Sequence, residues 1–296
     1  MLKQVLREER VGRFDLVYFA QRNSEEDRHY FKEYVGRARC TQFIEVRRAR
    51  FSIFSHIASY LAIADRFKSS EYDKIILASI DSLALRRFVA KHRNAEVVTF
   101  DDGSANVNLR SRYLVLQHRR RERVYAALFG APTTQSFRRL VARHYSIYPG
   151  FANIMPREIV RYLGLFPTAV AGGGRAKEVT IFIGQPVDSA SDAARAERIK
   201  AYVAGMKLDF YVQHPREESP LIAGAPLLDK KGRVAEEAIF ELGKDHRVTI
   251  LGGFSSVLLN IAPKFARKVM ILNGDSGNDH YLATLGKRAG CEVIFL

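Results

Sequence analysis

The stretch Arg247–Ala262, RVTILGGFSSVLLNIA, indicates the fold class. Its β-branched run Val248–Leu251 leads through Gly252-Gly253 to two serines, and an apolar run of helical character follows. Another β-branched run, Val269–Leu272, comes next along the chain. The order strand, helix, strand predicts a βαβ unit with two parallel strands.

The same alternation runs along the rest of the chain. The other predicted strands are Asp15–Phe19, Gln42–Val46, Lys74–Ala78, Glu96–Phe100, Val179–Ile183, Phe210–Gln213 and Val293–Leu296. Helical periodicity predicts helices at Ile53–Phe67, Ser82–Lys91, Ala193–Met206 and Ala235–Leu242. Because helices separate the strands, we expect an α/β fold built on parallel sheets.

The tract Ala171–Gly174, AGGG, is the predicted domain boundary, because three consecutive glycines suit a hinge. A chain of 296 residues is long enough for two lobes, each with its own core. We therefore expect two Rossmann-like lobes, residues 1–170 and 171–296. GT-B glycosyltransferases and periplasmic binding proteins share this outline, so the fold by itself leaves the function open.

The chain is strongly basic, with 47 Lys and Arg against 32 Asp and Glu and a net charge of +15. Such a balance favours polyanionic partners: nucleic acid, an anionic membrane surface or a phosphorylated saccharide. The run His118–Arg123, HRRRER, is either a solvated face or a contact for phosphate groups on a lipid acceptor.

The N-terminal sequence MLKQVLREERVGRF lacks the apolar segment of a signal peptide. The chain also has no window of about 18 apolar residues, so we expect no membrane span and only peripheral membrane contact. Cys40 and Cys291 have neither paired nor metal-ligand spacing, which is typical of a reducing compartment.

Four motifs with polar side chains follow directly after predicted strands, where ligands bind in open α/β sheets. In the first, Thr99–Val107, the pair Asp101-Asp102 forms either a tight turn or two carboxylates that orient sugar hydroxyls. In the second, Ile181–Tyr202, Asp188 is either a helix N-cap or a general base for an acceptor hydroxyl.

The third motif delivers His214 at the end of a strand, where Pro215 favours an extended conformation for it and Arg216 follows. An imidazole titrates near neutrality, so it can donate a proton or a hydrogen bond to a departing phosphate. In the fourth motif, Ser255 and Ser256 precede the apolar helix, where they either cap the helix or bind phosphate together with its first N–H groups.

Taken together, these segments resemble the bacterial lipooligosaccharide α-2,3-sialyltransferases of glycosyltransferase family 52. The resemblance extends from about Leu16 to Ala262 and rests on motifs that occur in the family's order. These motifs are IILASIDSLAL, VTFDDGSAN, HYSIYPGFANIM, IFIGQP, HPREE, VAEEAI and FSS.

The resemblance implies a GT-B-type fold in which residues 1–170 form the acceptor-side lobe and residues 171–296 bind the nucleotide sugar. It implies an inverting, metal-independent transfer of sialic acid from CMP-sialic acid to a terminal galactose of lipooligosaccharide, with no cofactor. It further implies a domain-swapped homodimer. With the basic charge, the expected location is the bacterial cytoplasm, peripheral at an anionic membrane surface.

By the same resemblance, Asp188 matches the general base and His214 the general acid that assists departure of CMP. Glu236, near a helix start, is expected to accept hydrogen bonds from ribose hydroxyls. The donor-binding segments are matched by Val212, Gln213, His214, Pro215, Arg216, Ala235, Glu236, Ser255 and Ser256.

Two features depart from the family pattern. Val187 intervenes between Gly-x-Pro and Asp188, which leaves Asp192 and Asp102 as alternative bases, with Asp101 as a possible acceptor contact. The family's first strand is also expected to be missing before Met1, because Leu2–Arg10 matches the first helix.

Two other functions remain open from the sequence. One is transfer from another donor, such as a glucosyl or Kdo nucleotide sugar, on the same fold. The other is nucleic-acid binding, which the basic charge suggests. The basic residues are scattered over many predicted helices and no recognition motif is present, so we expect no nucleic-acid partner.

Overall fold

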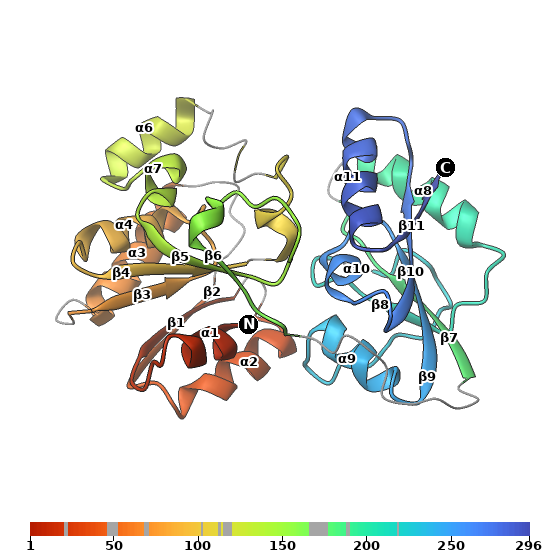
Figure 1. The fold of residues 1–296 in the computed structure, drawn as a ribbon, viewed down its shortest axis with the longest axis horizontal. Coiled ribbons are helices and arrows are strands. Elements are labelled where there is room, and N and C mark those ends of the chain that lie inside the picture. The colour runs from red at the N-terminus through yellow and green to blue at the C-terminus, as the bar shows by residue number, and fades with distance from the viewer. Residues whose placement is uncertain are drawn as a thin grey trace. The chain divides into compact units, whose positions relative to one another are not determined.

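The chain forms two compact units, Met1–Leu165 and Phe166–Leu296 (Figure 1). The structure is a computed structural model that describes residues 1–20, 23–45, 53–67, 71–101, 103–111, 114, 120–165, 177–187, 190–217 and 219–296. The predicted boundary, Ala171–Gly174, lies outside these residues. The division of acceptor and donor binding between residues 1–170 and 171–296 stays a prediction.

The first unit contains two parallel sheets. Strand β1 (Asp15–Ala20) pairs with β2 (Cys40–Glu45), and a four-stranded sheet has the order β3-β4-β5-β6. Its strands are β3 (Lys74–Leu77), β4 (Glu96–Phe100), β5 (Val141–Ser146) and β6 (Val160–Tyr162). The helices are α1 (Leu2–Glu8), α2 (Glu25–Val35), α3 (Ile53–Phe67), α4 (Leu83–Lys91), α6 (Arg120–Phe129) and α7 (Thr134–Arg138), with 3₁₀ turns η1 (Gly103–Asn106) and η2 (Arg157–Ile159).

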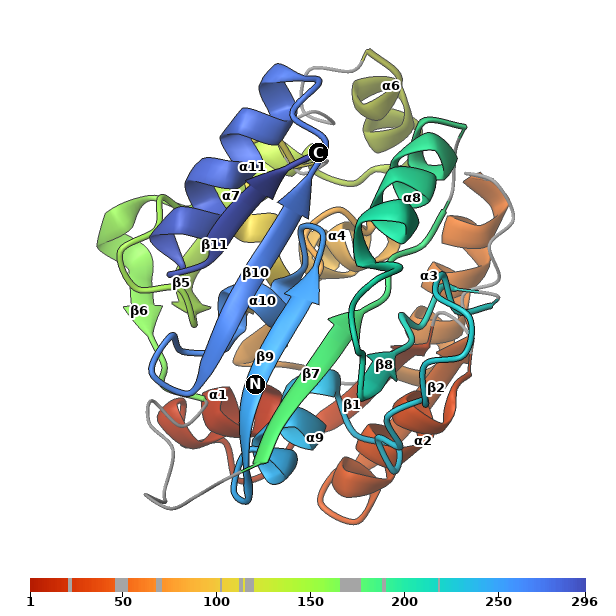
Figure 2. The ribbon, with the colours of Figure 1, turned by 90° about the vertical axis from the view of Figure 1, so that its right-hand side faces the viewer.

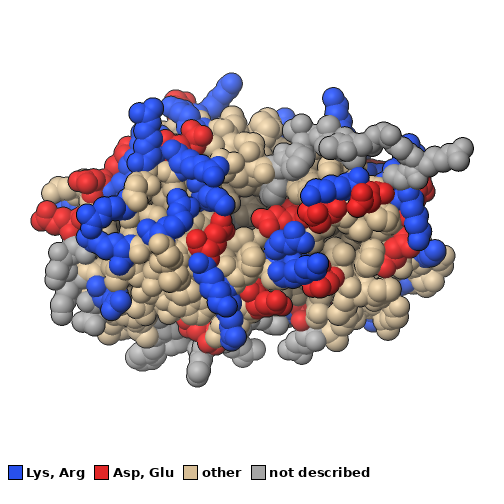
Figure 3. All heavy atoms as spheres, turned by 90° about the horizontal axis from the view of Figure 1, so that it is seen from below, with Lys and Arg blue, Asp and Glu red and all other residues tan. Residues whose placement is uncertain are grey.

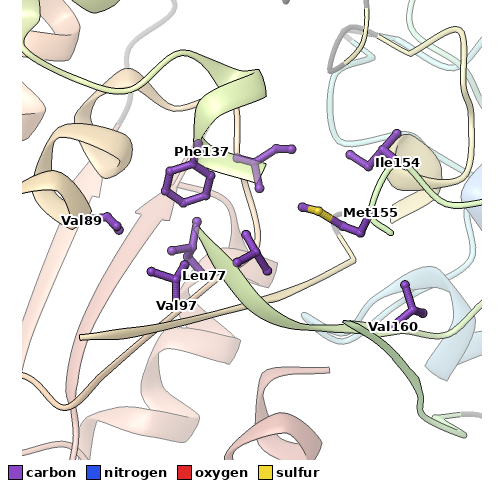
Figure 4. Packing of buried hydrophobic residues seen from close by; sticks show 9 residues of the cluster. Leu77, Val89, Val97, Phe137, Ile154, Met155 and Val160 are labelled. Carbon is purple, nitrogen blue, oxygen red and sulfur yellow. The ribbon is translucent and has the colours of Figure 1, made fainter. Parts of the chain in front are cut away.

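Helices α4 and α7 pack against the four-stranded sheet through one apolar cluster (Figure 4). Val89 of α4 and Phe137 of α7 meet Leu77 and Val97 from the strands, and Phe137 is fully buried. Burying an apolar side chain of this size stabilises the fold by roughly 1.5–3 kcal/mol. This core holds β3 and the amino ends of β4 and β5 against the two helices.

Strands β5 and β6 have no counterpart among the predicted strands. The sequence of β5, VARHYS, carries Arg143 and His144 within a short run and so does not read as a buried strand. In the structure His144 is fully buried, and its ring nitrogens meet Thr99 Oγ1 at 2.9 Å and Asp101 Oδ1 at 3.1 Å. Tertiary partners therefore satisfy the polar groups that obscured this strand.

In the described residues of the second unit, the strands form a five-stranded parallel sheet with the order β11-β10-β9-β7-β8. In Figure 2 the arrows of β10, β9 and β7 run side by side in one direction. The strands are β7 (Lys177–Ile183), β8 (Phe210–Val212), β9 (His246–Gly252), β10 (Ala266–Leu272) and β11 (Glu292–Phe295). The helices are α8 (Ala190–Val203), α9 (Ala235–Leu242), α10 (Ser256–Asn260) and α11 (Gly277–Arg288).

Helices cover both faces of this sheet. Ile199 and Val203 of α8 pack in one cluster with Phe182, Leu251 and Ile271. In Figure 1, α9, α10 and α11 lie on the opposite side of the sheet from α8. The second unit is therefore a doubly wound lobe, as the sequence predicts.

The order of the strands places a switch point in the centre of the sheet. The chain passes from β7 outward to β8, and then returns across β7 to form β9 on its other side. In open α/β sheets, ligands bind outside the carboxyl ends of the strands at such a point. We therefore expect a ligand-binding site at the loops that follow β7, β8 and β9.

Candidate functional site

The loops that follow β7, β8 and β9 are joined by direct hydrogen bonds. The Gly184 N–H donates to the Val212 carbonyl at 2.9 Å, which links the ends of β7 and β8. Gln185 Nε2 donates to the Phe254 carbonyl at 2.9 Å, which links the loops after β7 and β9. Three segments distant in sequence thus form one connected surface at the switch point.

Glycines allow these loops to approach one another. A Cβ at Gly184 would overlap the Glu217 carboxylate, and a Cβ at Gly253 would overlap the Gln185 amide. A larger residue at either position would displace one of these side chains and so the hydrogen bonds that it makes. The glycines after β7 and β9 are therefore part of the site's construction.

The turn after β8 holds His214 by its backbone and by its ring. The His214 backbone N–H donates to Glu217 Oε2 at 2.8 Å, and its carbonyl accepts the Glu217 N–H at 2.9 Å. The Arg216 backbone N–H donates to His214 Nδ1 at 3.0 Å. Since Nδ1 accepts a hydrogen bond, the proton of the neutral ring is on Nε2.

This arrangement suits His214 for contact with an anion. An Nε2–H group is a hydrogen-bond donor, and His214 itself is half-buried rather than enclosed in the core. Arg216 is also half-buried, whereas Pro215 is exposed. The predicted acid His214 therefore lies at the carboxyl edge of the sheet with a defined donor atom.

The neighbouring predicted donor contacts have more limited roles in this geometry. Val212 is only 3% exposed, so its side chain belongs to the core, while its carbonyl is used by Gly184. The Gln213 side chain donates through Nε2 to the Glu217 carbonyl at 3.2 Å. Both residues help to build the turn that carries His214.

Ser255 and Ser256 lie at the start of α10. Ser255 is the N-cap, and its Oγ accepts the Val257 N–H at 3.2 Å. The capping interpretation of Ser255 is thus confirmed, and its hydroxyl hydrogen remains a donor. Ser256 is half-buried in the first turn.

Glu236 lies in the first turn of α9 directly after Ala235. Its side chain is buried, and Oε1 accepts a hydrogen bond from Asn260 Nδ2 at 2.6 Å. Because Asn260 is the last residue of α10, this bond ties Glu236 to the helix that Ser255 caps. The predicted donor contacts in α9 and α10 are therefore connected.

Asp101, in the first unit, has a structural role in this geometry. It is 5% exposed, and its carboxylate meets His144 Nε2 at 3.1 Å, Asn106 Nδ2 at 3.0 Å and the Ile147 N–H at 2.8 Å. Through these partners Asp101 fixes the loops after β4 and β5. Its contact with an acceptor sugar stays a prediction.

Of the three candidate bases, Asp192 alone lies within the described residues. Asp188 and Asp102 lie outside the described residues. Asp192 lies in the first turn of α8, which follows the carboxyl end of β7, and is half-buried. The choice among Asp188, Asp192 and Asp102 thus stays a prediction.

Glu217, Gly184 and Gln185 were not singled out by sequence reasoning, although they belong to the quoted motifs. Burial raises the pKa of Tyr211 well above its ordinary value, and the adjoining Glu217 carboxylate raises it further. The Tyr211 hydroxyl therefore stays protonated and donates to Glu217 Oε1 at 2.5 Å. A signal for Glu217 was its place three residues after His214, which is the spacing of a turn.

Within the described residues, no group of three or more His, Cys, Asp or Glu side chains is arranged to hold a metal ion. In the same residues, none of the helices combines the length and the apolar character that crossing a membrane requires.

Comparison with known proteins gives a consistent family. The model of glycosyltransferase family 52 matches residues 13–274. The CMP-N-acetylneuraminate:beta-galactoside alpha-2,3-sialyltransferase of Pasteurella multocida is 27% identical over 245 residues, which are 78% of this chain and 74% of that enzyme. An N-acetyllactosaminide alpha-2,3-sialyltransferase of Neisseria meningitidis is 24% identical over 79% of this chain, and the match spans 64% of its own length, less than two thirds.

Solved structures share the fold. An alpha/beta-galactoside alpha-2,3-sialyltransferase from Photobacterium phosphoreum matches with a TM-score of 0.54 and 12% identity, over 95% of this chain and 98% of that one. The glycotransferase of kitacinnamycin matches with a TM-score of 0.52 and 10% identity, over 96% of this chain and 86% of that one. The fold of two α/β lobes is therefore of the GT-B type.

Proposed function

Because the chain belongs to glycosyltransferase family 52, we propose that it transfers sialic acid from CMP-sialic acid to the 3-hydroxyl of a terminal galactose. The observation that carries this proposal is the set of joined loops after β7, β8 and β9, which presents His214 with its proton on Nε2. A departing phosphate needs such a donor.

The reaction proposed is a single displacement. The acceptor hydroxyl gives its proton to an aspartate, and its oxygen attacks the anomeric carbon as the bond from that carbon to the CMP phosphate oxygen breaks. Attack opposite the leaving group inverts the configuration. Asp188 is the proposed base, and Asp192 and Asp102 are the alternatives.

His214 and the two serines are proposed to stabilise the leaving group. As the bond breaks, negative charge develops on the phosphate of CMP, and the Nε2–H of His214 is proposed to stabilise it by hydrogen bonding. The hydroxyls of Ser255 and Ser256 are further donors. Glu236 is proposed to accept hydrogen bonds from the ribose hydroxyls. Since CMP carries a single phosphate, these groups suffice without a metal ion.

The proposed acceptor is the galactose-terminated oligosaccharide of lipooligosaccharide, reached at an anionic membrane surface from the cytoplasmic side. Helix α6 supports membrane contact, because it exposes Arg120 and Arg123 beside Val124 and Leu128, which are 53% and 75% exposed.

On the face that Figure 3 shows, Lys and Arg side chains are interspersed with Asp and Glu. A duplex-binding track would be more continuous. A domain-swapped homodimer is proposed from the family resemblance.

The test compares donors with the full chain and a β-galactoside acceptor. CMP-sialic acid, CMP-Kdo and UDP-glucose are supplied separately, nucleotide release is measured, and the product linkage is determined by NMR. We expect turnover with CMP-sialic acid and an α-2,3 product. Turnover with CMP-Kdo or UDP-glucose and none with CMP-sialic acid would refute the proposal in favour of another donor.

A further inference from the structure

The turn after β8 contains a buried carboxylate that the proposed chemistry does not consume. Glu217 is 8% exposed and lies between the end of β8 and Gly184. Its two oxygens have different partners: Oε1 accepts the Tyr211 hydroxyl at 2.5 Å, and Oε2 accepts the His214 N–H at 2.8 Å. One carboxylate therefore connects the buried strand to the residue that carries the imidazole.

The backbone of Glu217 closes the same turn. Its N–H donates to the His214 carbonyl at 2.9 Å, and its carbonyl accepts Gln213 Nε2 at 3.2 Å. His214 is thus held on both sides of its Cα by one residue. Such a double attachment leaves the position of the ring dependent on Glu217.

The ring contact depends on this turn. The Arg216 N–H reaches His214 Nδ1 because Arg216 lies inside the four-residue turn that the His214–Glu217 bonds close. If the turn opened, Nδ1 would lose this donor, and the proton would distribute between the two ring nitrogens.

We propose that Glu217 is a positioning residue that keeps His214 in the orientation and tautomer in which Nε2 carries the proton. The inference rests on the proposed function, since it concerns the same donor site.

The test uses Glu217→Ala, Glu217→Gln and Tyr211→Phe in the full chain, with Glu241→Ala as control because Glu241 is exposed on α9. We expect Glu217→Ala to lower kcat about 10²-fold with little change in KM, because a displaced group of the site loses rate rather than binding. Glu217→Gln keeps one acceptor for the His214 N–H and should lose roughly tenfold. Tyr211→Phe should lose less, and the control nothing.

A second measurement determines the tautomer of His214 in the absence of CMP-sialic acid. The protein is labelled with ¹⁵N-histidine, and among its 8 histidines His214 is assigned as the signal that His214→Ala removes. We expect a protonated Nε2 and an unprotonated Nδ1 in the wild type, and averaged nitrogen shifts in Glu217→Ala.

The outcomes separate this proposal from the proposed function. Loss of kcat in Glu217→Ala with an unchanged His214 tautomer would overturn it, because Glu217 would then act in another way. If Glu217→Ala does not fold, the Gln variant decides: wild-type kcat and tautomer would overturn the proposal. If the wild type is inactive with CMP-sialic acid, the proposed sugar donor is wrong. The nitrogen shifts of His214 would still decide whether Glu217 sets its tautomer.

Discussion

His214 is a residue to which the proposed mechanism assigns stabilisation of the leaving group. Its Nδ1 is engaged by the Arg216 N–H, which leaves Nε2–H as the donor. Its backbone is fixed by Glu217. A histidine with this much local support loses little entropy when it meets an anion, which is what preorganisation requires.

We predict that His214→Ala lowers kcat by roughly 10²- to 10⁴-fold and changes the KM for the donor much less. The reason is that the charge on the phosphate oxygen is larger in the transition state than in the bound substrate. Steady-state kinetics with CMP-sialic acid measures both constants. The matched control is His246→Ala, at the amino end of β9, which should keep near-wild-type kcat.

Three variants test the prediction that Asp188 is the general base. Asp188→Ala should depress transfer to galactosides by a similar 10²- to 10⁴-fold, because the acceptor hydroxyl then keeps its proton. Slow hydrolysis of CMP-sialic acid should survive better, since water needs less deprotonation in front of a dissociating centre. Asp192→Ala and Asp102→Ala should stay active. If Asp188→Ala keeps wild-type transfer activity while folded Asp192→Ala or Asp102→Ala has none, the base is the residue replaced in the inactive variant.

At the scale of the element, a carboxylate just after helix α1 adds to the apolar contacts that join this helix to the first unit. Glu9, just after α1, accepts a bidentate pair from Arg143 at 2.8 and 3.0 Å, and also hydrogen bonds from Lys74 and Tyr145. Burial raises the pKa of Glu9, but the hydrogen bonds from Arg143, Lys74 and Tyr145 outweigh it and lower the pKa to about 2 from the ordinary 4.5. Glu9 therefore stabilises the fold as a carboxylate.

This predicts an acid-dependent loss of stability. A carboxyl group with a lowered folded pKa contributes stability above pH 4.5 and loses it as the pH falls towards 2, here up to about 3 kcal/mol. Denaturant unfolding at pH 7 should show Glu9→Gln destabilised by an amount of this order, and the difference from wild type should shrink below pH 4.5. The exposed neighbour offers the control, Glu8→Gln, which should change stability by less than about 0.5 kcal/mol. A gap between wild type and Glu9→Gln that is constant with pH would contradict the assignment.

Helix α6 has an inner and an outer face. Glu122 and Ala126 are buried, and Glu122 pairs with the buried Arg86 of α4 at 2.5 Å. The outer face carries Arg123, Val124 and Leu128. Arginines next to exposed apolar side chains are typical of a helix that lies in a lipid interface.

We predict that the chain binds phosphatidylglycerol vesicles more tightly than neutral ones, with an affinity that falls steeply as salt is added. Arg123→Gln should weaken binding roughly fivefold, the effect of about 1 kcal/mol per cation near an anionic surface. Arg247→Gln, exposed at the start of β9, is the charge-matched control. Vesicle sedimentation measures both. Equal affinity for neutral and anionic vesicles would exclude an electrostatic membrane role.

At the scale of the whole molecule, two α/β units share the GT-B type of fold with glycosyltransferases of little sequence identity. That likeness alone would leave the reaction open, because one fold hosts many chemistries. The family match over residues 13–274 restricts the reaction to glycosyl transfer. The site in the second unit then suggests how the leaving group is stabilised.

The proposed mechanism predicts that turnover does not respond to EDTA. In this mechanism His214 and the hydroxyls of Ser255 and Ser256 stabilise the charge on CMP, and no cation takes part. The measurement is CMP release before and after chelation. Activity that disappears with EDTA and returns with Mg²⁺ or Mn²⁺ would show that a cation takes part.

The sequence by itself determined the fold class, most strand positions and the motifs at the strand ends. Strands such as β4 and β9 consist of consecutive β-branched and apolar residues, so local composition identifies them without reference to partners. Their parallel order follows from the helices between them. For the same reason the motif with His214 could be placed at the carboxyl edge of a sheet.

Only the tertiary structure decided which polar side chains are structural. Strand β5 and the hydrogen bonds of Asp101 could not be predicted from the sequence, because the partners of their polar groups come from distant segments, such as Glu9 for Arg143 and His144 for Asp101. The role of Glu217 depends likewise on Tyr211 and on the space at Gly184. The physical reason is that a buried carboxylate is stabilised by the hydrogen-bond donors around it in space, and these donors come from segments that are distant in the sequence.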